Sequence, residues 1–202
     1  MIQNTKYEVM KFVEQGDRCY KGSDYIQGQL LAKYVQSNPY LEKAQIFLWI
    51  TELVKQVEQY HRCKGEQPYQ YVNPYMMVIS EEGEVRLIDA KASSNASLLT
   101  VANKQVIREH FLPEYLYDYS ASDVDTDIYG IGKSIQYIFA MTLPNPALTK
   151  WEEYVFQKIV RNCLNSEAKQ SYETPQDILK HLPKMKREGL TAMRIMRTIK
   201  GG

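Results

Sequence analysis

Apolar residues recur at steps of three and four in several stretches of the chain, which is the spacing of one face of an α-helix. The clearest stretch runs from residue 41 to about residue 61. The stretch 128–141 is apolar nearly all round, which is typical of a central, buried helix. The same spacing predicts three further helices, over residues 29–36, 151–164 and 175–182.

Shorter apolar runs predict β-strands. Residues 6–13 alternate loosely, and residues 18–21 follow the turn Gly16-Asp17, so we expect an N-terminal β-hairpin. Three further short strands are expected over residues 69–72, 75–79 and 85–88, the last two joined by a turn at Glu82-Gly83. Residues 91–103 lack strong periodicity and are expected to form a surface segment. These elements together predict an α+β, mainly helical fold.

Composition and charge indicate which classes of protein the chain can belong to. The chain has 202 residues, of which 44% are apolar and 24% charged, and its formal net charge is +1. These values are typical of a globular protein with a sizeable core. A nearly neutral chain gives no electrostatic reason to expect a nucleic-acid partner. No apolar run approaches the roughly 18 residues that a membrane-spanning helix needs.

Cysteine and histidine usage bears on redox state and metal binding. The three cysteines, Cys19, Cys63 and Cys163, form no CxxC pair. An odd number of unclustered cysteines favours a reducing compartment over a disulfide framework, so we expect free thiols and a cytoplasmic location. The three histidines lie far apart without the spacing of metal ligands, and we expect no metal site.

The order of short motifs along the chain is more specific than any single motif. A long helix ending at His61 is followed by a loop over residues 69–76 and by a hairpin that ends at Asp89. The sequence Phe111-Leu112-Pro113-Glu114 and a buried helix opening at Asp127 come next. This order resembles the C-terminal lobe of a protein kinase, over roughly residues 25–182.

The resemblance implies a division of the chain into three parts. A β-hairpin remnant over residues 1–24 would precede a kinase C-lobe-like helical domain over residues 25–183, and a basic amphipathic tail would follow over residues 184–202. No GxGxxG loop and no strand lysine of the kinase type precede residue 25. If Met1 is the true start, we expect half of the nucleotide cleft to be absent.

Two positions of the loop depart from active kinases, in which an aspartate accepts the substrate proton and an asparagine holds magnesium. When the loop is aligned on Pro74, Tyr71 stands in place of the aspartate and Met76 in place of the asparagine. A phenol with an ordinary pKa of about 10 is a poor proton acceptor at neutral pH. A thioether does not suit magnesium. We therefore expect no catalytic residue at these positions.

The kinase Asp-Phe-Gly motif is matched only at Asp89, because Ala90 and Lys91 follow it. A single carboxylate can hold magnesium when substrate phosphates complete the coordination shell. Asp89 equally suits a cap at the end of the hairpin or an ion pair with Lys91. We favour the structural role and expect neither a cofactor nor a metal, with Asp89 as a residual ligand only.

Four residues are expected in structural roles: Pro74, Pro113, Glu114 and Asp127. The resemblance implies that Asp127 accepts hydrogen bonds from the backbone of the loop. It also implies an arginine partner for Glu114, where this chain offers only Lys169, whose ammonium lacks the bidentate fork of an arginine.

The leading functional hypothesis is a catalytically inactive pseudokinase, a binding or regulatory module that is not an enzyme. It predicts an unknown protein partner, or self-association, with Tyr69, Tyr71 and Tyr75 as anchors. One alternative is an atypical serine/threonine kinase whose ATP cleft is completed by a partner chain. The other is the cytoplasmic kinase-like part of a membrane-associated assembly, with the basic tail on the membrane surface.

Overall fold

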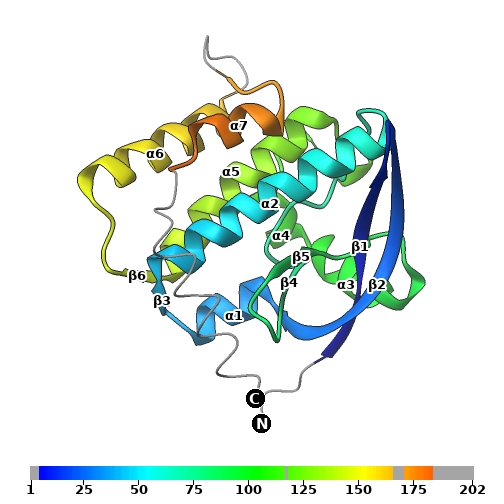
Figure 1. Cartoon of the computed structure of the whole chain (residues 1–202), viewed down its shortest axis with the longest axis horizontal. Helices are drawn as coiled ribbons and strands as arrows, with labels where there is room; N and C mark the ends of the chain where they lie inside the picture. Colours follow the sequence, from blue (N-terminus) through cyan, green and yellow to red (C-terminus); the bar gives the residue numbers. More distant parts are fainter. Residues whose placement is uncertain (1–4, 117, 166–170, 184–202) are drawn as a thin grey trace.

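The computed structural model describes residues 5–116, 118–165 and 171–183 (Figure 1). The chain begins with a long β-hairpin of β1 (Thr5–Gln15) and β2 (Arg18–Leu30), in antiparallel register from Thr5↔Gly28 to Gln15↔Arg18. Gly16 has φ +59°, a left-handed backbone conformation that glycine adopts without steric cost, and it allows the tight turn between the strands. The predicted N-terminal hairpin is therefore present, with longer strands than the sequence pattern indicates.

A four-stranded antiparallel sheet continues the hairpin in the order β1-β2-β4-β5, with β4 (Met77–Ser80) and β5 (Val85–Leu87). Gly28 of β2 lies so close to β4 that a Cβ atom there would be 2.2 Å from the carbonyl oxygen of Ile79. The sheet also curls back on itself, because Val9 of β1 forms a bridge with Ile88 at the end of β5. As a result β1, at the far edge of the sheet, lies against the residues that follow β5.

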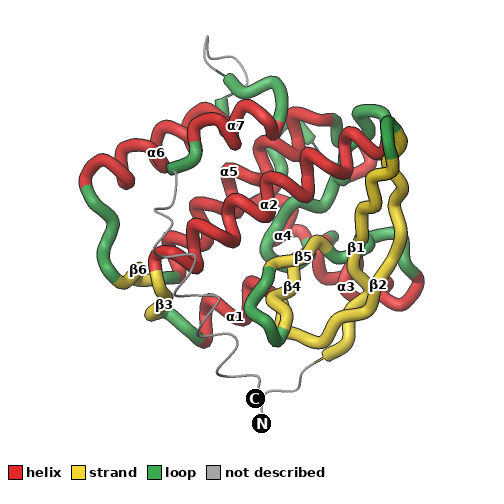
Figure 2. The backbone as a smooth tube through the Cα atoms, in the orientation of Figure 1, coloured by secondary structure: helices red, strands yellow, loops and turns green. Residues whose placement is uncertain are grey.

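Helices make up the rest of the fold and lie mainly on one side of this sheet (Figures 1 and 2). Helices α2 and α5 run side by side through the centre, and α6 and α7 cover their outer side. Their bounds are α1 (Leu31–Ser37), α2 (Lys43–Lys64), α3 (Ala96–Ala102), α4 (Gln105–Phe111), α5 (Val124–Met141), α6 (Lys150–Leu164) and α7 (Pro175–His181). Two 3₁₀ turns, η1 (Ser93–Asn95) and η2 (Tyr119–Ala121), and a parallel pair, β3 (Tyr40–Glu42) and β6 (Leu143–Asn145), complete the described elements.

Local sequence explains where the two central helices begin and end. The apolar stripe of α2 is buried, with Trp49 and Ile50 at 1% and 0% exposure, and the helix ends at Gly65 in the left-handed conformation. Helix α5 opens with a capping box, in which the Asp123 carboxylate accepts the backbone N–H of Thr126 and the Thr126 hydroxyl accepts the backbone N–H of Asp123.

The α+β, mainly helical fold class is confirmed, and the five helices expected from periodicity are present. One expectation is wrong, because residues 69–72 form a loop and no strand. Residues 91–103 lie mostly at the surface, as expected, and they contain η1 and α3. The boundary placed after residue 24 falls inside β2, which runs through it without a break.

Helix α5 packs unusually closely on the loop over residues 69–76, and this contact is testable. A Cβ atom at Gly130 would lie 2.5 Å from the carbonyl oxygen of Val72. Gly130→Ala should therefore lower the free energy of unfolding by about 2 kcal/mol through overpacking, although glycine-to-alanine changes in exposed helix interiors stabilise by up to about 1 kcal/mol.

Chemical denaturation followed by circular dichroism measures this change. Ala140→Gly, at an exposed position of the same helix, is the control and should cost less than about 1 kcal/mol. A Gly130→Ala variant that is at least as stable as the wild type would contradict the close approach of α5 to the loop.

Candidate functional site

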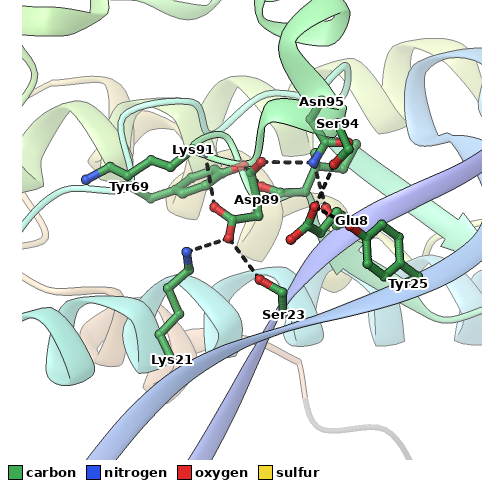
Figure 3. A network of polar contacts seen from close by, with 10 residues as sticks. Glu8, Lys21, Ser23, Tyr25, Tyr69, Asp89, Lys91, Ser94 and Asn95 are labelled. Carbon is green, nitrogen blue, oxygen red and sulfur yellow. Dashed lines mark hydrogen bonds and ion pairs between the residues drawn. The ribbon is translucent and has the colours of Figure 1, made fainter.

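Asp89, two residues after the end of β5, lies at the centre of a polar cluster (Figure 3). Asp89 is only 5% exposed. Its Oδ2 atom lies 2.5 Å from Lys21 Nζ and 3.4 Å from Ser23 Oγ, both on β2. Its Oδ1 atom accepts the backbone N–H of Lys91 at 3.1 Å, which is the capping turn that the sequence suggests. The carboxylate is therefore held by a lysine ammonium, a hydroxyl and a backbone amide.

Main-chain contacts fix the position of Asp89 as firmly as its side chain does. Its N–H donates to the carbonyl oxygen of Glu8 at 2.9 Å, and its own carbonyl accepts Asn95 Nδ2 at 2.9 Å. The same Asn95 amide also donates to the Glu8 carbonyl at 2.8 Å. Strand β1 and the turn η1 thus hold Asp89 by hydrogen bonds from two sides.

The carboxylate of Glu8 extends the cluster towards the surface (Figure 3). Its Oε2 atom accepts hydrogen bonds from Ser94 Oγ at 2.6 Å and from the hydroxyl of Tyr25 at 2.8 Å. These bonds from Ser94 and Tyr25 hold the pKa of Glu8 below its usual range, and the same bond to Glu8 raises the pKa of Tyr25. Sequence reasoning missed Glu8, Lys21 and Ser23 as members of this site.

A second, fully buried group holds the neighbouring loop in place. Asp127, in the first turn of α5, has an exposed fraction of 0%. Its Oδ2 atom accepts the backbone N–H of Tyr69 at 2.5 Å, and its Oδ1 atom accepts that of Gln70 at 2.8 Å. His61 Nε2, at the end of α2, lies 2.8 Å from Oδ2. Burial raises the pKa of Asp127, while the hydrogen bonds from His61, Tyr69 and Gln70 act against that rise.

This arrangement explains why the loop is not a strand. The N–H groups of Tyr69 and Gln70 are used by Asp127, and Gln70 has φ +79°, which interrupts extended backbone. The carbonyl of Pro74 accepts the N–H of Ala32, which ties the far end of the loop to α1.

The structure buries three of the loop positions singled out from the sequence, Tyr69, Pro74 and Met76. Tyr69 is 4% exposed and donates its hydroxyl proton to the carbonyl of Ile88 at 2.7 Å, so burial holds its pKa well above the usual range. The role of Tyr69 as an anchor for a partner stays a prediction, and it requires the ring to leave this buried position. Met76 is 0% exposed and belongs to the hydrophobic core.

The other singled-out residues differ in how far they are exposed. Tyr71 is half-buried, and Tyr75 is half-buried with its ring 6.3 Å from that of Phe111. Pro113 is buried and Glu114 is exposed. Lys169 and the basic tail over residues 184–202 lie outside the described residues. The use of Tyr71 and Tyr75 as interaction anchors stays a prediction.

The residues around Asp89 do not fit magnesium on their own. Both oxygens of Asp89 already have hydrogen-bond partners, and the positions expected to add ligands carry Tyr71 and Met76. Across residues 5–116, 118–165 and 171–183, no cluster of three or more His, Cys, Asp or Glu side chains is arranged to hold a metal ion. No phosphoryl-transfer step through a metal can be derived from this chain's residues alone.

The expectation of three free cysteines is wrong. Cys19 of β2 and Cys63 of α2 form a disulfide, with their Cα atoms 4.8 Å apart, and Cys163 is a buried free thiol whose pKa is raised by burial. The two partners are 44 residues apart, so no local motif reveals the pair. The cytoplasmic location loses the support that it drew from unpaired cysteines and stays a prediction.

The hydrogen bonds of Asp127 give a direct mutational test. Asp127→Ala leaves two buried N–H groups without an acceptor, so the free energy of unfolding should fall by about 3 kcal/mol. The exposed neighbour Asp125 is the control, and Asp125→Ala should change stability by less than about 0.5 kcal/mol. Urea denaturation measures both. Similar, small effects of the two substitutions would show that the hydrogen bonds of Asp127 do not stabilise the loop.

Comparison of the sequence with known proteins finds a named relative. No protein-family model matches the chain. The chain is 23% identical over 194 residues to a protein of Clostridium acetobutylicum named as a probable serine/threonine-protein kinase. The match covers 85% of this chain and 29% of that protein, so the chain spans less than a third of the relative's length. The similarity supports a kinase-like relationship.

This relative corrects the expectation that the protein is not an enzyme. A protein named as a probable kinase points to an enzyme, although this chain has Tyr71 and Met76 at two positions that active kinases use.

The described helices also bear on whether the chain crosses a membrane. Among the described helices, none combines the length and the apolar character that crossing a bilayer requires.

Proposed function

We propose that this chain is a kinase-like domain that takes part in the phosphorylation of serine or threonine hydroxyl groups, in a cleft completed by a partner chain or a further protein segment. The observation that carries the proposal is the ion pair between Lys21 and Asp89, 2.5 Å long, beside the loop held by Asp127. The similarity to a probable serine/threonine kinase supports it.

The chain's own contribution is a fixed loop and a shielded pair of opposite charges. The side chains of Lys21 and Asp89 are 16% and 7% exposed. In such a partly desolvated place, electrostatic interactions are stronger than at the open surface. A lysine ammonium is also an effective point charge for phosphate oxygens, so Lys21 is the residue of this chain best suited to contact a phosphate group.

The missing groups define the chemistry of the partner. The phenol of Tyr71 does not serve as the proton acceptor, and the thioether of Met76 does not serve as a magnesium ligand. A completing protein segment must therefore bring at least one carboxylate as base and additional oxygen ligands. We expect this segment to approach Tyr71 and Tyr75, the half-buried tyrosines of the loop.

The test uses the protein captured with its natural partners from its source cells. Phosphate transfer from radiolabelled Mg·ATP to a generic serine-containing protein substrate is measured on the captured material. Asp89→Asn should lower the transfer rate at least tenfold, because it removes the negative charge that draws the Lys21 ammonium into the site.

Asp24→Asn is the matched control. Asp24 lies on the same strand as Lys21, and its carboxylate is 56% exposed, so its loss should leave transfer unchanged. Circular dichroism of the purified variants checks that both fold. Absence of phosphate transfer in the wild-type capture, or equal transfer by the Asp89→Asn variant, would overturn the proposal.

A further inference from the structure

Two side-chain contacts accompany the disulfide that joins the tip of the β1–β2 hairpin to the C-terminal end of α2. The hairpin turn lies beside the end of α2 (Figure 1). Besides the Cys19–Cys63 disulfide, an ion pair joins Glu14 to Arg62, and the rings of Phe12 and Tyr60 meet edge-on with their centroids 6.4 Å apart. The ion pair is about half exposed on both sides, and exposed pairs contribute little to stability. The disulfide is therefore the strongest link at this contact.

The disulfide lies on the same face of β2 as the groups that hold Asp89. Side chains two residues apart on a strand share a face, so Cys19, Lys21 and Ser23 all face the same way. Lys21 and Ser23 both contact the Oδ2 atom of Asp89, and Cys19 is bonded to α2. A displacement of Cys19 away from α2 would therefore also move Lys21 away from Asp89.

The two cysteines of the disulfide lie partly at the surface, where a reductant can approach them. Cys19 and Cys63 are both partly exposed, unlike the buried Cys163. A dithiol reductant such as a thioredoxin-class protein converts the disulfide into two thiols by giving two electrons and two protons, and it becomes a disulfide itself. The reverse reaction, with the oxidised form of such a protein, closes the bond again.

We propose that the Cys19–Cys63 disulfide is a redox-reversible clamp on the Lys21–Asp89 pair. In the oxidised protein the hairpin is bonded to α2, and Lys21 is held against Asp89. Reduction by a dithiol protein releases the tip of the hairpin from α2, so that the Lys21 ammonium can leave Asp89 and contact a phosphate-bearing ligand, while the Glu8 carbonyl still holds the backbone of Asp89. The clamp rests on the proposed function only for the identity of that ligand, because the release of Lys21 is measurable without any phosphate transfer.

Lysine footprinting tests the clamp. The purified chain, oxidised or reduced with a phosphine, is treated briefly with an acetylating reagent, and the labelling rate of each lysine is measured by mass spectrometry. We expect the rate at Lys21 to rise at least fivefold on reduction. In the unreduced wild type, Cys19 and Cys63 should resist alkylation, with only Cys163 modified after unfolding.

Lys43 is the matched control for general loosening of the fold. Its ammonium lies 2.9 Å from Glu152, and the two side chains are 18% and 15% exposed, values close to those of Lys21 and Asp89. Its labelling rate should not change on reduction. The Cys63→Ser variant should label rapidly at Lys21 without reductant, whereas Cys163→Ala should respond to reduction as the wild type does.

Three results would overturn the clamp: no disulfide in the oxidised chain, equal labelling of Lys21 in both states, or a parallel rise at Lys43. If Lys21 is released but phosphate transfer does not depend on Asp89, the clamp holds and the proposed function fails. If phosphate transfer depends on Asp89 but the labelling of Lys21 does not respond to reduction, the proposed function stands and the clamp fails. The two proposals can therefore fail separately.

Discussion

A buried carboxylate that accepts hydrogen bonds from two backbone amides and contacts a histidine is the constraint on which the rest of the structure depends. Asp127 joins the end of α2, the start of α5 and the loop between α2 and β4. Burying a charged group is costly unless it is fully paired, so the three segments must meet accurately. Once they do, the loop leads directly into β4, and the β4–β5 hairpin places Asp89.

The polar cluster at Asp89 depends on this framework and also on the N-terminal hairpin. The framework of Asp127 is built from α2, α5 and the loop, whereas Asp89 is also held by the N-terminal hairpin, through the carbonyl of Glu8 and the ammonium of Lys21. The hairpin is thus part of the site and is more than an appendage to a helical domain. This is consistent with β2 running unbroken from the disulfide into the sheet.

The sequence pattern could predict the helices because each buries a regular apolar stripe, as in α2 with Trp49 and Ile50. It missed the seven-residue helices α3 and α4, in which only one and two residues are buried, because so short a contact leaves no periodic signal. The motif order was enough to place Asp127 and Asp89 near the loop. It could not reveal Lys21 or the disulfide, because their partners lie 68 and 44 residues away and are brought together only by the tertiary fold.

The contacts of Asp127 also bear on how far such a sequence can diverge. Its carboxylate binds the N–H groups of Tyr69 and Gln70, and every residue except proline offers that group. These two hydrogen bonds therefore do not depend on the identity of the side chains, whereas the φ of +79° at Gln70 and the buried hydroxyl of Tyr69 set separate limits on exchange at these positions. A chain built in this way can lose the residues by which a family is usually identified and still hold its backbone in the same shape.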